Sequence, residues 1–386
     1  MRKKSIKSNV TFNIEIAIDN FESKQPLFES DVVYHTQTGK TDHVTIYTNK
    51  IIIKGKRRDT NAFISFQKQN DLTEFYKSTI YDQILKSLIF FYYATKKAPI
   101  ITSISFILNE DKDSITIIEK TEINFLIGKS MKLFDNIQFN IDGKKIFEKD
   151  KKGKCFYDSS LFLLQANHES SQFYTFERLW KSFNLIYNMH SNSTIDSEGL
   201  DKIIKYIKSN PTHFKSSTTK LLSIEDDTFA SFRWEDLIKN SLKQDKFKVL
   251  FSDYKTEKIQ NVFKSRAIWL KKIKNKILEK KRNELSNNQK ESKSYEKLQK
   301  QITTISSIDF YEKTSIKEPT EDEKLSDYLQ LILRNYIYFV RCSYFHGSKN
   351  DNKYKLFTRN NNPELSFINS FMSQLIIDCL VNIDKL

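Results

Sequence analysis

Apolar and polar residues alternate along the first part of the chain. The clearest case begins at residue 10, where every second position is apolar, at Val10, Phe12, Ile14, Ile16 and Ile18. A period of two places apolar side chains on one face of a strand and polar side chains on the other. β-Branched runs at residues 100–108 and 114–118 predict two more strands. The first 155 residues therefore predict a β-rich module.

Two short turns and one helix complete the pattern of this module. Asn49-Lys50 separates the apolar segments 44–48 and 51–53, which predicts a hairpin. Asp142-Gly143 lies among the apolar residues of 137–146, and Asp-Gly is a strong signal for a two-residue hairpin turn. A helix over residues 71–96 is predicted because apolar residues recur there at helical spacing, at Leu72, Phe75, Tyr76, Ile80, Ile84, Leu88 and Phe91.

The apolar period changes to that of a helix after the short charged segment 147–153. We therefore expect a domain boundary near residue 155, with a regulatory or partner-binding domain at 1–155 and a helical domain at 156–386. A core-facing helix is indicated by apolar residues at Phe176, Leu179, Trp180, Phe183 and Tyr187. Residues 197–209 predict another helix, and residues 255–304 predict a long basic helical insertion.

The strongest helix signals lie near the end of the chain. Thr320 and Glu323 form a capping box after Pro319, so a helix is predicted over residues 321–346. Its buried stripe is formed by Leu325, Tyr328, Leu329, Ile332, Tyr336, Phe339 and Val340. The last helix, 364–386, is strongly apolar and must be packed. The predicted fold class is α+β, with an N-terminal β-rich module followed by a C-terminal all-α helical bundle.

Composition excludes several classes of protein. The 386 residues include only 7 glycines, and no G-x-G-x-x-G or G-x-S-x-G motif occurs. Gly128-Lys-Ser130 resembles the tail of a P-loop, but Ile123 occupies the position of its first glycine. The 3 cysteines are widely spaced and form neither a disulfide framework nor a zinc pattern. We expect no metal, no cofactor, no membrane segment and a cytoplasmic location.

The charge of the chain favours a polyanionic partner. The formal net charge is +15 and the isoelectric point is near 9.3. Residues 241–300 contain 18 Lys and Arg against 7 Asp and Glu, and so carry +11 of that charge. A surface of this kind tracks phosphates, and we expect RNA contacts from Lys271, Lys272, Lys274, Lys276 and Lys349. The alternative interpretation is a solvated helix face without a nucleic-acid partner.

Arg341 and His346 form a candidate site for phosphodiester chemistry. A guanidinium can hold a phosphate and balance the charge of the transition state, whereas an imidazole can transfer protons near neutral pH. Residues five apart on an ideal helix point about 140° away from each other. Therefore the helix distorts near Gly347, or two copies of the motif face each other in a dimer. The structural alternative is a histidine that stabilises the helix end and an arginine in a surface ion pair.

Residues 338–349, Tyr-Phe-Val-Arg-Cys-Ser-Tyr-Phe-His-Gly-Ser-Lys, resemble the R-x(4–6)-H signature of the HEPN superfamily. In that superfamily the motif lies between the last two helices of an all-α bundle. The helix at 176–188, with its Trp, Phe-Asn and Tyr, resembles the opening helix of these domains. The resemblance covers roughly residues 165–386 and does not extend to the first 155. Cys342 stands where the family usually has Asn, Asp or His.

The resemblance implies a metal-independent endoribonuclease of the toxin or antiviral-defence type, active as a homodimer with a composite site. Arg341 would contact the scissile phosphate, and His346 would act in proton transfer. The 2′-hydroxyl would attack and leave a cyclic phosphate. Cys342 and Ser343 can supply hydrogen bonds, and Asn184 is expected to orient a motif side chain. An antitoxin, activating ligand or phage protein is the expected kind of regulator.

Two other functions are compatible with the sequence. A non-catalytic protein could use the same basic bundle to bind RNA or to dimerise. Alternatively, Glu110 and Lys112 after a strand, with Asp82 upstream, match the skeleton of a metal-dependent DNase. Asp82 falls on the predicted helix, however, and Glu-x-Lys is common in a chain rich in both residues.

Overall fold

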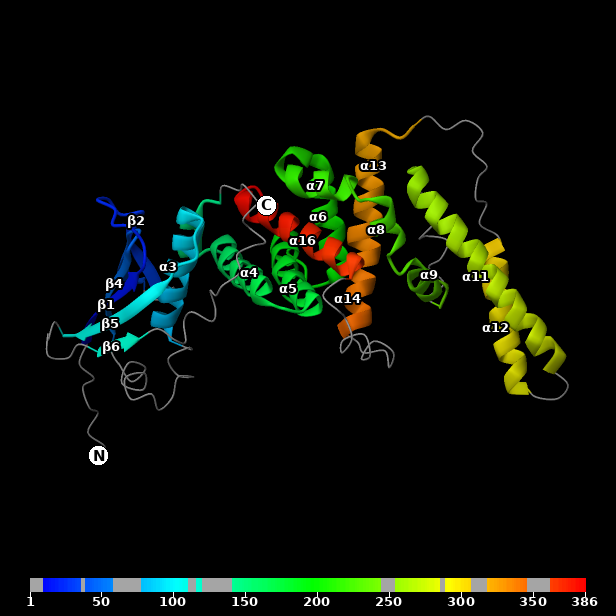
Figure 1. Ribbon diagram of the computed structural model, residues 1–386, viewed down its shortest axis with the longest axis horizontal. Coiled ribbons are helices and arrows are strands. Elements are labelled where there is room, and N and C mark those ends of the chain that lie inside the picture. Colours follow the sequence, from blue (N-terminus) through cyan, green and yellow to red (C-terminus); the bar gives the residue numbers. More distant parts are fainter. Residues whose placement is uncertain are drawn as a thin grey trace. The chain divides into compact units, whose positions relative to one another are not determined.

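The computed structural model divides the chain into two compact units (Figure 1). The first, here called the sheet unit, comprises Met1–Asn192 and Ile376–Leu386, and the second, the helical unit, comprises Ser193–Leu375. The structure describes residues 10–35, 39–57, 78–109, 116–119, 141–243, 254–284, 289–306, 318–345 and 362–386.

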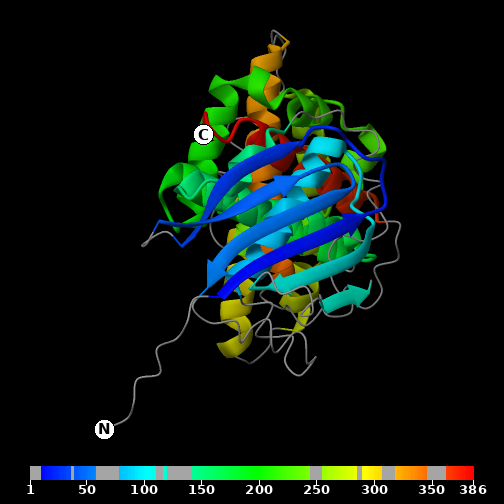
Figure 2. The same cartoon turned by 90° about the vertical axis from the view of Figure 1, so that its left-hand side faces the viewer.

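The sheet unit is built on six antiparallel strands, and the fold class is α+β as predicted. The strands are β1 (Val10–Ile18), β2 (Phe28–His35), β3 (Lys40–Ile46), β4 (Lys50–Arg57), β5 (Ile101–Leu108) and β6 (Thr116–Glu119). Their order across the sheet is β2-β3-β4-β1-β5-β6, which places β1 next to both β4 and β5 (Figure 2). The predicted strands at 10–18 and 100–108 and the hairpin at Asn49-Lys50 are confirmed, whereas β2 was not predicted.

One face of the sheet forms the core of this unit. The predicted alternation in β1 is reproduced in its burial, since Ile14 and Ile16 are fully buried while Glu15 between them is exposed. Helix α3 (Thr79–Thr95) packs on this apolar face of β3 and β4 (Figure 2). Ser78 caps its first turn and Lys96 ends it in a left-handed conformation.

The predicted hairpin at Asp142-Gly143 is wrong for the residues that the structure describes. Residues Gly143–Phe147 form a 3₁₀ turn (η2), in which the Asp142 side chain accepts a hydrogen bond from the amide of Lys144. Phe147 stacks on Phe28 at 4.5 Å between ring centroids. Asp is as effective at starting a helical turn as at forming a hairpin, and burial of the aromatic ring favours the helical turn here. Residues 137–140 lie outside the described part of the chain.

Helices α4 (Lys151–His168) and α5 (Gln172–Ser191) belong to the sheet unit. They pair through buried serines, because Ser159 and Ser182 each donate a hydrogen bond to the other's carbonyl oxygen, at 3.2 and 2.9 Å. Tyr93 of α3 donates to Ser160 of α4 at 2.8 Å. The predicted boundary near residue 155 thus falls inside α4, whereas the compact units divide at residue 192.

A buried ion pair supports one edge of the sheet. The guanidinium of Arg57 on β4 donates to both carboxylate oxygens of Asp42 on β3, at 2.7 and 2.8 Å. Gln83 of α3 donates to the same carboxylate at 3.4 Å. Gly55 makes room for this pair, since a Cβ at that position would lie 2.1 Å from the Asp42 oxygen. The arrangement joins two strands to the helix that covers them.

The helical unit contains α6 (Asp196–Ser209), η3 (Pro211–Phe214), α7 (Lys215–Leu222), α8 (Asp226–Ala230), α9 (Trp234–Lys243), α11 (Glu257–Glu284), α12 (Gln289–Ser306) and the helices that carry the motif. Its core is aromatic. Trp234 packs against Phe232, Phe263 and Tyr336, with ring centroids 4.7 to 5.4 Å apart. The predicted helix at 197–209 is confirmed as α6.

The penultimate helix runs from Glu321 to Phe345 in three segments, α13 (Glu321–Tyr328), the π-helical η4 (Leu329–Ile337) and α14 (Tyr338–Phe345). The predicted capping box is present, since Thr320 accepts from the Glu323 amide and Glu323 accepts from the Thr320 amide. All seven residues of the predicted apolar stripe are buried. The π-helical segment corrects the expectation of an uninterrupted α-helix and shifts the rotational phase of the residues after it.

Helix α16 (Pro363–Val381) is the strongly apolar last helix predicted from the sequence. By length and composition it is the one helix among the described residues that could cross a membrane, and 78% of its apolar window is buried inside the protein. The buried core helix of a soluble protein meets the same criteria. Inside the helical unit its Glu364 accepts hydrogen bonds from Tyr336 and Arg233, at 2.9 and 3.2 Å.

We predict that Asp42→Asn destabilises the sheet unit by about 3–5 kcal/mol, because it leaves the Arg57 guanidinium buried without its counter-charge. Hydrogen exchange of β3 and β4, together with urea unfolding, measures the effect. Glu15→Gln, on the exposed face of β1, is the matched loss of one carboxylate and should be nearly neutral. Equal exchange in the two variants would contradict a structural role for the pair.

Candidate functional site

The described part of the motif lies on α14 at the surface of the helical unit. Phe339 and Val340 are buried, with exposed fractions of 9% and 0%, and they hold the helix against the core. Arg341, Cys342 and Ser343 follow directly and are each half-buried. The backbone is α-helical through Phe345. Phe339 and Val340 therefore fix the helix against the core, while the Arg341 side chain remains 25% exposed.

Arg341 lies among groups that keep it charged. Its Nη2 is 3.7 Å from the Asp196 carboxylate, and its Nη1 is 3.8 Å from the Cys342 sulfur. Partial burial alone would lower the pKa of Arg341, but Cys342 and Asp196 raise it. Burial and the neighbouring Cys342 also raise the pKa of Tyr338, whose ring lies 6.0 Å from the guanidinium. At neutral pH the site therefore offers a cation beside a neutral hydroxyl.

Helix α6 supplies carboxylates to both arginines of the penultimate helix. Asp201 accepts a hydrogen bond from the Nε of Arg334 at 2.6 Å. Arg341 lies seven residues further along the penultimate helix and pairs with Asp196. The side chains of Arg341 and Asp196 remain 25% and 20% exposed, and their separation is longer than that of Arg334 and Asp201. A partly exposed pair of this kind contributes at most about 1 kcal/mol. A bidentate contact between a guanidinium and a phosphate is shorter and stronger than the 3.7 Å contact between Arg341 and Asp196.

The other predicted site residues fall in different parts of the chain. His346 and Lys349 lie outside the described residues. Asn184 lies on α5 in the sheet unit, where it donates to the Tyr187 hydroxyl and accepts from Asn188 at 3.0 Å. Its hydrogen bonds to Tyr187 and Asn188 are made within its own helix. The proposed orienting role of Asn184 therefore remains a prediction.

The predicted RNA-binding lysines of α11 do not share one environment. Helices α11 and α12 pack as a hairpin, here called the basic arm (Figure 1). Lys274 donates to Gln301 of α12 at 2.6 Å and so faces the inside of the arm. Lys272 and Lys276 are exposed, and Lys271 is half-buried. Two of the four predicted lysines are therefore placed on the open face of the helix.

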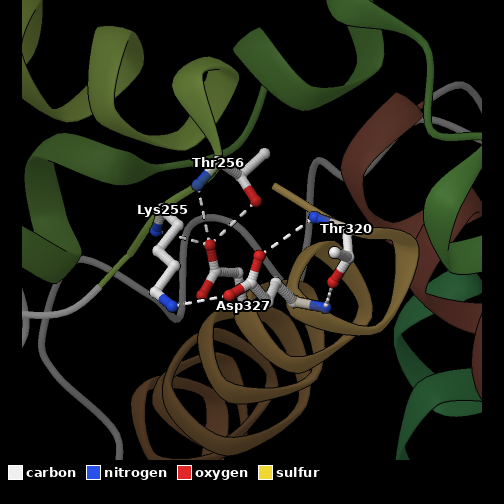
Figure 3. A network of polar contacts seen from close by, with 5 residues as sticks. Lys255, Thr256, Thr320 and Asp327 are labelled. Carbon is white, nitrogen blue, oxygen red and sulfur yellow. Dashed lines mark hydrogen bonds and ion pairs between the residues drawn. The ribbon is translucent and has the colours of Figure 1, made fainter. Parts of the chain in front are cut away.

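A buried carboxylate fixes the start of the basic arm on the penultimate helix, which the sequence did not reveal. Asp327 accepts hydrogen bonds from the amides of Lys255 and Thr256, both at 2.7 Å, and from the Thr256 hydroxyl at 2.8 Å (Figure 3). The carboxylate compensates the amides that a helix leaves unsatisfied at its start. The sequence signal that could have revealed this anchor is the aspartate itself, because Asp327 lies between the buried stripe residues Leu325 and Tyr328.

A second contact joins the arm to the cap of the same helix. The Nζ of Lys255 lies 2.6 Å from the carboxylate of Glu323, which also completes the capping box with Thr320 (Figure 3). The ion pair raises the pKa of Lys255 and lowers that of Glu323. These contacts attach the start of the arm to the penultimate helix, which also carries Arg341.

The residues of the alternative DNase site are only partly described. Glu110 and Lys112 lie outside the described residues. Asp82 lies on α3, as predicted, and accepts a hydrogen bond from Tyr157 at 3.2 Å. Among the residues that the structure describes, no group of three or more His, Cys, Asp and Glu side chains could hold a metal ion.

Comparisons with protein-family models, with curated proteins and with solved structures return no significant match for this chain. The HEPN resemblance therefore rests on residues 338–349 and 176–188 alone. The proposed function therefore depends on the geometry of Arg341 and its neighbours.

We predict that Asp327→Ala loosens the basic arm and lowers the stability of the helical unit by about 2–3 kcal/mol, because three donors lose a charged acceptor. Hydrogen exchange should accelerate in the first turns of α11. Asp322→Ala removes an exposed carboxylate from the first turn of α13 and should leave α11 protected. Unchanged protection of α11 in Asp327→Ala would refute this anchoring role.

Proposed function

We propose that the protein is a metal-independent endoribonuclease that uses Arg341 and His346. The observation that carries the proposal is the partly exposed, charged Arg341 on a helix whose opposite side is buried, five residues before a histidine in the sequence. Two further features support it. The Asp196 pair is weak enough to be displaced by a phosphate, and the net charge of +15 favours a polyanionic substrate.

In the proposed reaction the 2′-oxygen of the RNA attacks the adjacent phosphorus. Arg341 holds the non-bridging oxygens and balances the charge of the transition state. His346 transfers a proton, either from the 2′-hydroxyl or to the departing 5′-oxygen. The new O2′–P bond forms while the P–O5′ bond breaks, so the products are a 2′,3′-cyclic phosphate and a 5′-hydroxyl. All protons come from the substrate or solvent, and the chemistry needs no metal ion.

We propose that the active form is a homodimer with a composite site. Side chains five residues apart on a regular helix diverge by about 140°. The backbone of α14 is helical through Phe345, and His346 lies outside the described residues. The choice of two copies therefore rests on the resemblance to HEPN proteins. Arg341 of one protomer and His346 of its partner would then face a single phosphate.

The sheet unit is proposed to restrain the nuclease or to receive its trigger. The biological role that fits is growth arrest or antiviral defence in the cytoplasm, under the control of an antitoxin, activating ligand or phage protein. This part of the proposal rests on the resemblance of residues 338–349 to HEPN proteins.

A second candidate function is RNA binding without cleavage. The Arg341–Asp196 pair favours it, because an arginine held by a carboxylate has a structural role without any substrate. The exposed lysines of the basic arm would serve a binding protein equally well. Cleavage by the full-length protein separates the two functions.

We predict that the purified protein cleaves RNA in EDTA and that Arg341→Ala and His346→Ala each reduce the rate at least 100-fold, as expected for loss of charge stabilisation or proton transfer. Analysis of the RNA ends should give cyclic phosphates. Arg334→Ala removes an arginine from the same helix, outside the motif, and is the matched control with near-normal activity.

Two outcomes would contradict the nuclease. Tight RNA binding without cleavage in the wild type would favour the binding protein. Cleavage that requires added magnesium and survives His346→Ala would redirect attention to Glu110 and Lys112. Urea unfolding of wild type and both variants is the control, because equal stability shows that a loss of activity does not come from unfolding.

A further inference from the structure

One face of the basic arm combines an exposed tryptophan with lysines. The chain has 3 tryptophans. Trp180 and Trp234 are core residues with exposed fractions of 4% and 0%, whereas Trp269 on α11 is 43% exposed. Burial of an indole is strongly favourable. An exposed tryptophan on a helix therefore indicates a binding surface more often than an exposed lysine does.

Two lysines share the face of Trp269. Lys272 and Lys276 follow at positions i+3 and i+7, and both are exposed. Residues at these spacings lie on one side of a helix. The opposite side of α11 is occupied by Phe263, which is buried in the core of the unit. The exposed side of the arm is therefore an aromatic and cationic stripe.

Charge decides what kind of partner fits this stripe. Further along the helix, Lys280 and Arg282 are exposed and Glu279 is the acidic residue among them. A second copy of the arm would bring lysines against lysines, which is unfavourable. A polyanion with flat, stackable groups satisfies both components, since phosphates pair with the lysines and a base covers the indole.

We propose that the exposed face of α11 is a binding site for single-stranded RNA. Trp269 stacks on one base, and Lys272 and Lys276 contact the phosphates beside it. Along the helix axis the two lysines lie about 4.5 and 10 Å from Trp269, which is within the span of two to three nucleotides. Duplex bases are already stacked on each other and cannot cover the indole, so the site selects unpaired strands.

This inference rests on the proposed function for its choice of RNA. It adds that the RNA is single-stranded and that Trp269, which the charge pattern did not reveal, binds it. The basic arm would hold an unpaired segment. Because Asp327 joins the arm to the helix that carries Arg341, the two sites belong to one unit of the structure.

The first test measures binding of the full-length protein to a 2′-O-methylated oligoribonucleotide, which cannot be cleaved by 2′-hydroxyl attack. Stacking on Trp269 should quench tryptophan emission, because Trp269 is the exposed indole. Trp269→Ala should weaken binding about 5- to 150-fold and abolish the quench. Trp269→Phe should abolish the quench but retain most of the affinity, since a phenyl ring still stacks.

The second test separates the lysines from the overall charge. Each phosphate contact to a single strand contributes about −0.7 to the slope of log K against log salt. Lys272→Gln with Lys276→Gln should therefore make the slope shallower by about 1.4. The matched control, Lys205→Gln with Lys208→Gln, removes two exposed lysines of α6 and should leave the slope unchanged.

Three results would overturn the proposal: unchanged affinity in Trp269→Ala, equal binding of a duplex of the same sequence, or a change of oligomeric state in Trp269→Ala with normal RNA binding. The last result would identify the stripe as a protein interface. Because the probe cannot be cleaved, these outcomes are independent of nuclease activity. Normal quenching without cleavage of ordinary RNA would support the binding site and reject the proposed nuclease.

Discussion

Burial of one side of the penultimate helix constrains the whole helical unit. Leu329, Ile332 and Tyr336 are almost fully buried, and the helix cannot rotate without exposing them. The charged groups around it are then positioned by this packing. The Tyr336 hydroxyl meets Glu364 of the last helix, Asp327 receives the start of α11, and Arg341 faces Asp196 of α6.

These polar contacts differ in burial. The buried contact at Glu364 has a structural role, whereas the partly exposed contact at Arg341 belongs to the candidate site. Glu364 is nearly buried between Tyr336 and Arg233, and burial raises its pKa in spite of the arginine. Removal of Tyr336 or Arg233 as a hydrogen-bond partner would leave Glu364 buried without compensation, which destabilises the folded state. Arg341 and Asp196 are partly exposed, and their ion pair is long at 3.7 Å. The proposed function centres on Arg341 because its side chain is charged and partly exposed and its contact with Asp196 is long.

The hydrophobic pattern predicted elements with clear periodicity well. The alternation of β1, the helix α6 and the capping box at Thr320 were all recognisable, because each depends on residues close together in sequence. Asp142-Gly143 misled because its local chemistry suits two structures, and contact between Phe147 and Phe28 favours the helical turn. The division of the chain at residue 192 also depends on long-range packing, since the serines of α4 and α5 pair within the sheet unit.

By itself the sequence determined the fold class, the basic stretch at 255–304 and the pairing of arginine and histidine in one motif. Each of these follows from residue type and spacing, which do not depend on what packs nearby. The tertiary structure alone decided that Arg341 meets Asp196, that Lys274 turns inward, and that Trp269 faces solvent. The exposure of a side chain depends on which helix covers its face, and that partner can lie anywhere along the chain.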